Sequence, residues 1–235
     1  MTEPGINIED VDFEQLYQGK SPLGPRMPWD IGAAQPAIVA LEDAGEFTGE
    51  VADLGCGLGD NAIFLASRGH HVTGLDGAPS AIEEARARAA AAGVEVGFAV
   101  ADALKLTGYE GRFDTVLDSA LYHCFTEEVR HTYVEALTRV TRPGARLHLF
   151  CFSEQLPDHF PTPFRISEAN LRETVGRDWT IESLEPAIYT TAFDPAALRA
   201  SVQALLGQDA AFAELETDGK GNVLVPVWQL KAVRR

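Results

Sequence analysis

The sequence contains few cysteines, and they form no pattern that binds a metal or builds a disulfide framework. Cys56, Cys124 and Cys151 are far apart, include no C-x-x-C pair and stand in apolar surroundings. Such cysteines are typical of buried thiols in a reducing compartment. The motifs H-E-x-x-H and G-x-S-x-G are also missing, so no zinc protease or serine hydrolase is indicated. We expect neither a metal site nor covalent catalysis.

Basic residues are scarce as well: 19 lysines and arginines stand against 35 acidic residues, for a formal net charge of −16. A surface this negative disfavours nucleic-acid backbones and anionic membranes, although the charge can also serve solubility alone. The N-terminus has no basic-then-apolar signal pattern, and no apolar run is long enough to span a bilayer. We expect a cytoplasmic protein with a small-molecule substrate and no nucleic-acid or membrane partner; the oligomeric state stays open.

The chain of 235 residues is 46% hydrophobic, which is enough for a substantial core. No internal repeat, low-complexity tract or linker divides it. We therefore expect one domain over residues 1–235. Within it, residues 1–35 form an N-terminal lid segment, in which Phe13, Leu16 and Tyr17 have helix-like spacing and residues 21–36 are rich in proline and glycine.

The most informative stretch is Val51–Asn61, where an apolar run ends in a glycine-rich turn and a helical pattern follows at once. This order indicates strand, tight loop and helix. Gly55, Gly57 and Gly59 allow positive φ angles and a close approach of the backbone to a ligand. The helix N-terminus behind the loop offers N–H donors to that ligand.

A second acid, Asp76, ends the next apolar run about 20 residues after the first glycine, the spacing of an acid that binds ribose hydroxyls in a nucleotide-binding unit. The glycine spacing is G-x-G-x-G, however, not the dinucleotide fingerprint G-x-G-x-x-G. Two carboxylates, Asp53 and Asp60, flank the turn and would repel a pyrophosphate. They suit a ligand with a cationic end.

On these residues the chain resembles the class I methyltransferases that use S-adenosylmethionine (SAM). Their first motif is similar to Asp53–Gly59, and their second acid is similar to Asp76. A Pro-Trp-Asp segment ahead of the glycine motif, Pro28–Asp30, resembles the thiopurine, thiol and halide branch and its bacterial relatives. That likeness implies that Trp29 borders the cofactor; its alternative is an anchor in the core.

The resemblance also implies further cofactor contacts. An acid after the third strand, matched here by Asp102 beside Ala103, would meet the adenine amino group; its alternative is a simple turn acid. Asp118 and Ser119 match the fourth motif, at the methionine end of SAM, and lie at the mouth of the site if the fourth strand ends at Leu117. The complete set implied to bind SAM is Trp29, Asp53, Gly55, Cys56, Gly57, Gly59, Asn61, Asp76, Gly77, Asp102, Ala103, Asp118 and Ser119.

For catalysis we single out His123 as a general base, because neutral imidazole accepts a proton near pH 7. Tyr122 or Asp118 could serve instead, and His123 could equally be a structural side chain under the following helix. A thiol acceptor needs little help from a base, so we predict a small thiol as the acceptor, with a hydroxyl or amine as the second choice. A dinucleotide-dependent oxidoreductase and a non-catalytic SAM-binding protein remain the alternatives.

Apolar periodicity and turn residues set the expected elements. We expect strands at 50–54, 71–75, 94–100, 113–118, 146–152, 179–184 and 223–233. We expect helices at 35–46, 60–69, 80–92, 127–141 and 167–174 and from 194 on. Residues 153–163 are a candidate substrate loop. The expected fold is α/β: a Rossmann-like, doubly wound, seven-stranded sheet, mostly parallel with an antiparallel last strand, and helices on both faces.

Overall fold

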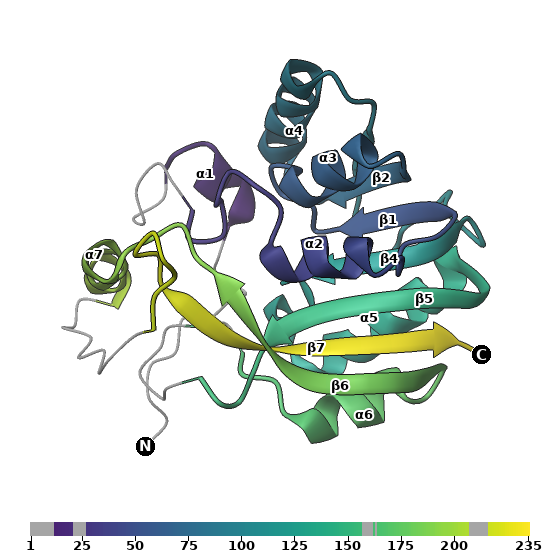
Figure 1. The fold of residues 1–235 in the computed structure, drawn as a ribbon. Coiled ribbons are helices and arrows are strands. Elements are labelled where there is room, and N and C mark those ends of the chain that lie inside the picture. The colour runs from purple at the N-terminus through teal and green to yellow at the C-terminus, as the bar shows by residue number, and fades with distance from the viewer. Residues whose placement is uncertain (1–11, 21–26, 157–161, 163, 207–215) are drawn as a thin grey trace.

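The computed structural model of the chain describes residues 12–20, 27–156, 162, 164–206 and 216–235 (Figure 1). Its strands are β1 (Glu50–Leu54), β2 (His71–Asp76), β3 (Gly97–Val100), β4 (Phe113–Ser119), β5 (Thr141–Phe152), β6 (Trp179–Thr190) and β7 (Leu224–Arg234). Its α-helices are α1 (Phe13–Tyr17), α2 (Pro36–Asp43), α3 (Asp60–Ser67), α4 (Pro79–Ala92), α5 (Glu127–Val140), α6 (Glu168–Val175) and α7 (Pro195–Leu206). A short 3₁₀ helix, η2, spans Tyr122–Cys124.

The strands form one seven-stranded sheet in the order β3-β2-β1-β4-β5-β7-β6. β1 to β5 pair in parallel, while β7 runs antiparallel to both of its neighbours, β5 and β6. This confirms the predicted sheet with its antiparallel last strand. Because α7 separates β6 from β7 in the chain, these two strands are neighbours without being a tight hairpin.

Helices cover both faces of the sheet, as predicted (Figure 1). Apolar side chains of α2, α3 and α4, such as Ile38, Leu65 and Ile82, pack into the core on one face. Tyr133 of α5 and Leu171 of α6 belong to the core on the other face. Strands buried on both faces in this way are the expected result of helical crossovers between parallel strands.

The ends of the helices follow local sequence rules. α4 begins with Pro79 at its first position and ends at Gly93, whose φ of 68° is left-handed. Ser167 caps α6, because its side chain accepts a hydrogen bond from the backbone N–H of Asn170 at 3.1 Å. The end of α4 at Gly93 and the cap at Ser167 match the sequence prediction, while α4 begins one residue earlier than predicted.

Three strand boundaries differ from the prediction by three or more residues. β3 begins at Gly97, and β6 continues to Thr190, because β7 pairs with it along its length. β5 begins at Thr141, directly after α5, so Pro143 lies inside the strand. It falls where the register between β4 and β5 shifts, a place where a residue without an N–H is tolerated.

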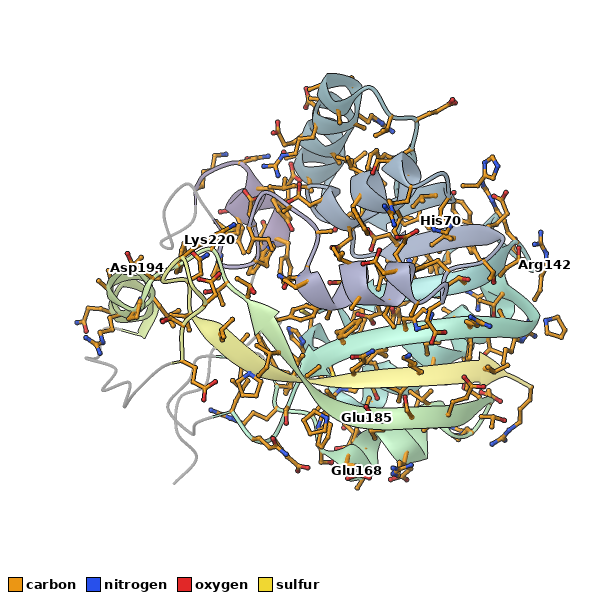
Figure 2. All side chains as sticks on the ribbon, in the orientation of Figure 1. His70, Arg142, Glu168, Glu185, Asp194 and Lys220 are labelled. Carbon is orange, nitrogen blue, oxygen red and sulfur yellow. The ribbon has the colours of Figure 1, made fainter. Side chains whose placement is uncertain are left out.

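The carboxyl ends of β1, β2 and β4 point toward the side of the molecule where α1 and α7 lie (Figure 1). Figure 2 marks the two ends: Arg142, at the start of β5, is at the opposite side from Asp194 and Lys220. Ligands of doubly wound sheets bind at the carboxyl ends. In the described part of the chain, no helix is long and apolar enough to cross a membrane.

Candidate active site

The glycine loop between β1 and α3 takes a backbone shape that only glycine adopts easily. Gly55, Gly57 and Gly59 have φ angles of 66°, 51° and 85°. The backbone N–H groups of Gly55 and Cys56 both donate to the carbonyl of Leu75, at 2.8 and 3.1 Å. The loop is therefore held against the end of β2 and presents bare backbone at the carboxyl edge of the sheet.

Gly59 also lacks room for a side chain, and this gives a test of the loop. A Cβ at Gly59 would stand 2.7 Å from Cζ of Phe98 and 3.0 Å from Cβ of Ala85, whereas a Cβ at Gly69 (φ 96°) has nothing within 4 Å. Both Gly→Ala variants strain the backbone by about 1–2 kcal/mol. We expect Gly59→Ala to lower the melting temperature more than its control Gly69→Ala and to weaken SAM binding. Equal effects of the two variants would mean that the loop is not closely packed.

Asp53, at the end of β1, is a buried acid without a hydrogen-bonding partner. Its side chain is 1% exposed, and neither carboxyl oxygen has a partner among the described residues. Burial, together with the nearby Asp76 and Asp118, raises the pKa of Asp53 to about 8. The backbone amide of Ala62 at the start of α3 opposes this shift. A buried carboxylate in such a position favours a cationic or hydrogen-bond-donating ligand.

Asp76, at the end of β2, faces the same loop. Its Oδ2 accepts the N–H of Gly57 and its Oδ1 accepts the N–H of Ala78, each at 2.8 Å. Burial raises the pKa of Asp76, and these amide hydrogen bonds oppose the shift. Gly77 follows as an exposed residue with an open approach. The structure thus brings the loop, Asp53 and Asp76 together, as the sequence predicted.

These residues fit the cofactor that the resemblance implies. SAM carries positive charge on its sulfonium and amino groups, and Asp53 supplies a buried carboxyl group without a hydrogen-bonding partner among the described residues, which a bound cation would favour in its ionised form. Asp76 offers carboxylate lone pairs next to an exposed glycine, which suits ribose hydroxyls. A pyrophosphate would have to approach both acids at once.

Asp60 has a different role from the one expected. Nη1 of Arg88 lies 3.2 Å from its Oδ1 and 3.0 Å from Oδ1 of Asp30. The Asp60 carboxylate is thus engaged in an ion pair with Arg88 of α4. Asn61 likewise serves the N-terminal segment, because its Oδ1 accepts the N–H of Gln35 at 3.1 Å. Cys56 is half-buried in the loop.

Asp102 and Ala103 follow β3 at the same edge. Asp102 is exposed, its Oδ1 accepts the N–H of Leu104 at 2.9 Å, and its Oδ2 lies 2.9 Å from Nζ of Lys105. The hydrogen bond from Lys105 lowers the pKa of Asp102. These are the contacts of a turn acid. An adenine contact stays a prediction.

Asp118 does not lie at the mouth, because β4 continues to Ser119 and buries it completely. Its Oδ1 accepts the N–H groups of Leu121 and Tyr122 at 2.8 and 3.2 Å, and its Oδ2 accepts the hydroxyl of Tyr133 at 2.9 Å. Burial still raises its pKa to about 7. Asp118 therefore holds the turn after β4. Ser119 is half-buried, with its Oγ 2.8 Å from the hydroxyl of Tyr189.

The two residues singled out for catalysis are both buried in η2. The hydroxyl of Tyr122 donates to Oδ1 of Asn170 at 3.0 Å. Nδ1 of His123 accepts the backbone N–H of Phe152 at 3.1 Å, and its ring stacks on Phe152 with the centroids 4.1 Å apart. Burial, and next the charge of Arg130, lower the pKa of His123 to about 3. This environment argues against a general base; a catalytic role for either residue stays a prediction.

The described part of the lid segment packs over the glycine loop. Tyr17 of α1 lies above Gly57, where an added Cβ would be 2.8 Å from the tyrosine hydroxyl. Nε1 of Trp29 donates to that hydroxyl at 3.2 Å, and Ser80 of α4 binds Glu14 through both its N–H and its Oγ. Trp29 is 41% exposed and thus is not an anchor in the core. Residues 1–11 and 21–26 lie outside the described residues.

The sequence did not identify Tyr17 as a site residue. Its helix-like apolar spacing predicted only a helix, and Gly57, which it contacts, is 40 residues away in the chain. A cavity of about 430 Å³ opens beside it, between α1, residues 27–30 and α4. Neither Asp53 nor Asp76 lines this cavity, so we do not assign the cofactor to it. Of the candidate substrate loop, residues 157–161 and 163 lie outside the described residues.

Three comparisons with known proteins identify relatives of this chain. The family model described as "Methyltransferase domain" matches residues 51–144, from β1 to the start of β5. The chain is 38% identical to 2-heptyl-1-hydroxyquinolin-4(1H)-one methyltransferase of Mycobacteroides abscessus, and the alignment covers all of both chains.

Solved structures share the fold of this chain. A structure described as "Conversion of a Disulfide Bond into a Thioacetal Group during Echinomycin Biosynthesis" is 38% identical, with a TM-score of 0.77, covering 94% of this chain and 91% of the other. Magnesium protoporphyrin IX methyltransferase from Synechocystis with bound SAM shares the fold at 22% identity and a TM-score of 0.57, covering 85% and 76%.

Proposed function

This chain belongs to the class I SAM-dependent methyltransferases, and from that premise we propose that it methylates a hydroxyl group on a small aromatic molecule. The support is the full-length relative at 38% identity, whose name gives a hydroxyquinolinone as its substrate. A small thiol, the acceptor favoured by the sequence, is the second candidate, because an equally similar structure concerns sulfur chemistry.

Several residues of the site would together position SAM for methyl transfer. When bound, SAM supplies a methyl group on a sulfonium that is already a good leaving group. Asp53 would meet its positive charge, Asp76 its ribose, and the glycine loop would let the backbone approach. Tyr17 and Trp29 would close the N-terminal lid over the loop and exclude water. Aligning two reactants and excluding water is the main contribution that such a transfer needs.

The test is the transfer of an isotopically labelled methyl group from SAM, followed by mass spectrometry of the acceptor. The panel pairs 2-heptyl-1-hydroxyquinolin-4(1H)-one with an aromatic thiol and an aromatic amine of similar size. We expect label on the hydroxyl oxygen, with turnover at least tenfold above that on the other two acceptors. Label on sulfur alone would replace the hydroxyl assignment by the thiol. SAM binding without any product would indicate a non-catalytic protein.

A further inference from the structure

Arg130, in the first turns of α5, is a buried cation without a counter-ion. Its side chain is 5% exposed, and no carboxylate among the described residues forms an ion pair with it. Nη1 donates to the neutral Oδ1 of Asn170 at 3.3 Å, and Nε has no partner. Burying an unpaired charge is unfavourable, because the charge loses its hydration and gains no counter-ion. Such a side chain therefore calls for a reason beyond packing.

The surroundings of Arg130 stabilise it only in part. The guanidinium lies 5.5 Å from the ring centroid of Tyr122 and 5.2 Å from that of Phe164. Cation–π contacts of this kind stabilise a buried guanidinium but do not neutralise its charge. Its place near the N-terminus of α5 is unfavourable, because the helix dipole is positive there. The charge of Arg130 is therefore not fully compensated, and it can act on groups next to η2.

The charge of Arg130 acts on His123 of η2, where burial and then this charge lower the pKa of the imidazole. Because the backbone N–H of Phe152 donates to Nδ1, the neutral imidazole carries its proton on Nε2. Nε2 has no partner among the described residues. In this tautomer His123 is a hydrogen-bond donor. It could accept a proton only at Nδ1, against the N–H of Phe152 and with Arg130 nearby.

We propose that the methyl acceptor binds as an oxyanion that receives a hydrogen bond from Nε2–H of His123, with the buried guanidinium of Arg130 supplying the opposite charge behind it. This inference rests on the proposed function and names its substrate class: aromatic molecules with an acidic hydroxyl. An oxyanion needs no base. Its lone pair forms the new O–C bond as the S–C bond breaks, the electron pair stays on sulfur, and no proton passes to the protein.

Other titratable groups around Arg130 do not take the place of the acceptor. The hydroxyl of Tyr133, whose ring lies close to Tyr122, donates its hydrogen bond to Asp118. Glu127 and Glu128 are exposed on the first turn of α5. The titratable groups that affect the pKa of Arg130 are Tyr122, Cys151, Glu127 and Glu128. Burial raises the pKa of Tyr122 and of Cys151, so both stay neutral, and the two charged groups of this set are the exposed carboxylates.

The experiment measures acceptor binding in the absence of SAM, by calorimetry between pH 5 and pH 9. The probes are 2-heptyl-1-hydroxyquinolin-4(1H)-one and the same quinolone without the hydroxyl on nitrogen. We expect the wild type to bind the hydroxylated probe more tightly as it ionises. Arg130→Met, which keeps the volume but not the charge, should lose at least tenfold affinity for this probe and little for the other. The control Arg139→Gln, an exposed arginine on the same helix, should match the wild type.

Two results would overturn the proposal. The first is an equal loss of affinity for both probes in Arg130→Met, which would indicate a structural role. The second is a wild-type protein that binds neither probe, or binds both with the same affinity. The second variant pair is His123→Gln and His123→Leu. Glutamine can accept the N–H of Phe152 and still donate, so it should retain more affinity than leucine; equal losses would contradict the donor role. Charge-dependent binding without methyl transfer would refute the proposed function alone, and transfer with charge-independent binding would refute this inference alone.

Discussion

Asp76→Ala is expected to lower the affinity for SAM by at least about 100-fold, which corresponds to about 2.8 kcal/mol. The carboxylate holds the N–H of Gly57 in the loop and that of Ala78 before α4. Hydrogen bonds to a charged group contribute about 1.5–3 kcal/mol each. The alanine variant loses both of them, along with the acid available to the ribose.

Titration calorimetry of SAM into the wild type and Asp76→Ala checks this result. The control is Asp43→Ala, which removes an exposed acid whose partner is Arg68 on the surface. Surface ion pairs of this kind contribute about 0–1 kcal/mol, so the control should bind SAM as the wild type does. If Asp76→Ala retains wild-type affinity, the second acid does not belong to the cofactor site.

Asp53→Asn is expected to have opposite effects on stability and on binding. In the ligand-free protein the buried carboxylate has its pKa raised to about 8, against about 3.9 in an unfolded chain. The native state therefore binds more protons than the unfolded state between these values, and stability falls as the pH rises through this window. The asparagine variant removes this loss. It also removes the negative charge that would meet SAM, so the affinity for SAM should fall at least about tenfold.

The readout is the free energy of unfolding of ligand-free protein between pH 6.5 and pH 9, a range in which the buried histidines are neutral. The wild type should lose stability across this range. Asp53→Asn should lose less, by a few kcal/mol at about 1.4 kcal/mol per pKa unit. A residual slope is expected from Asp118, whose pKa is also raised, to about 7. Identical slopes for the two proteins would show that Asp53 is not a buried, unpaired carboxylate.

The sequence predicts the parts of this site that depend on short-range pattern. The glycine loop, Asp53 and Asp76 come from two strand–turn units, and the spacing of their residues fixes which edge of the sheet they share. Short-range patterns also predict the helices on both faces of the sheet and the start of α6. These features follow from turn chemistry and apolar period, which act over a few residues.

What could not be predicted depends on contacts between distant segments. The length of β4 decides that Asp118 is buried, and that length follows from its pairing with β5. Asp60 forms an ion pair with Arg88, 28 residues away, and Nδ1 of His123 accepts the backbone N–H of Phe152. In each case the residue type predicted a role in binding or proton transfer. The polar atom needed for that role instead forms a hydrogen bond or an ion pair with another part of the protein.

The most direct test of the account is a titration of SAM, and separately of NADH, into the wild-type protein. The account predicts one-to-one binding of SAM in the micromolar range and no binding of NADH, because Asp53 and Asp76 favour a cationic ligand over a pyrophosphate. Binding of NADH, or no binding of SAM, would contradict the assignment of these two acids.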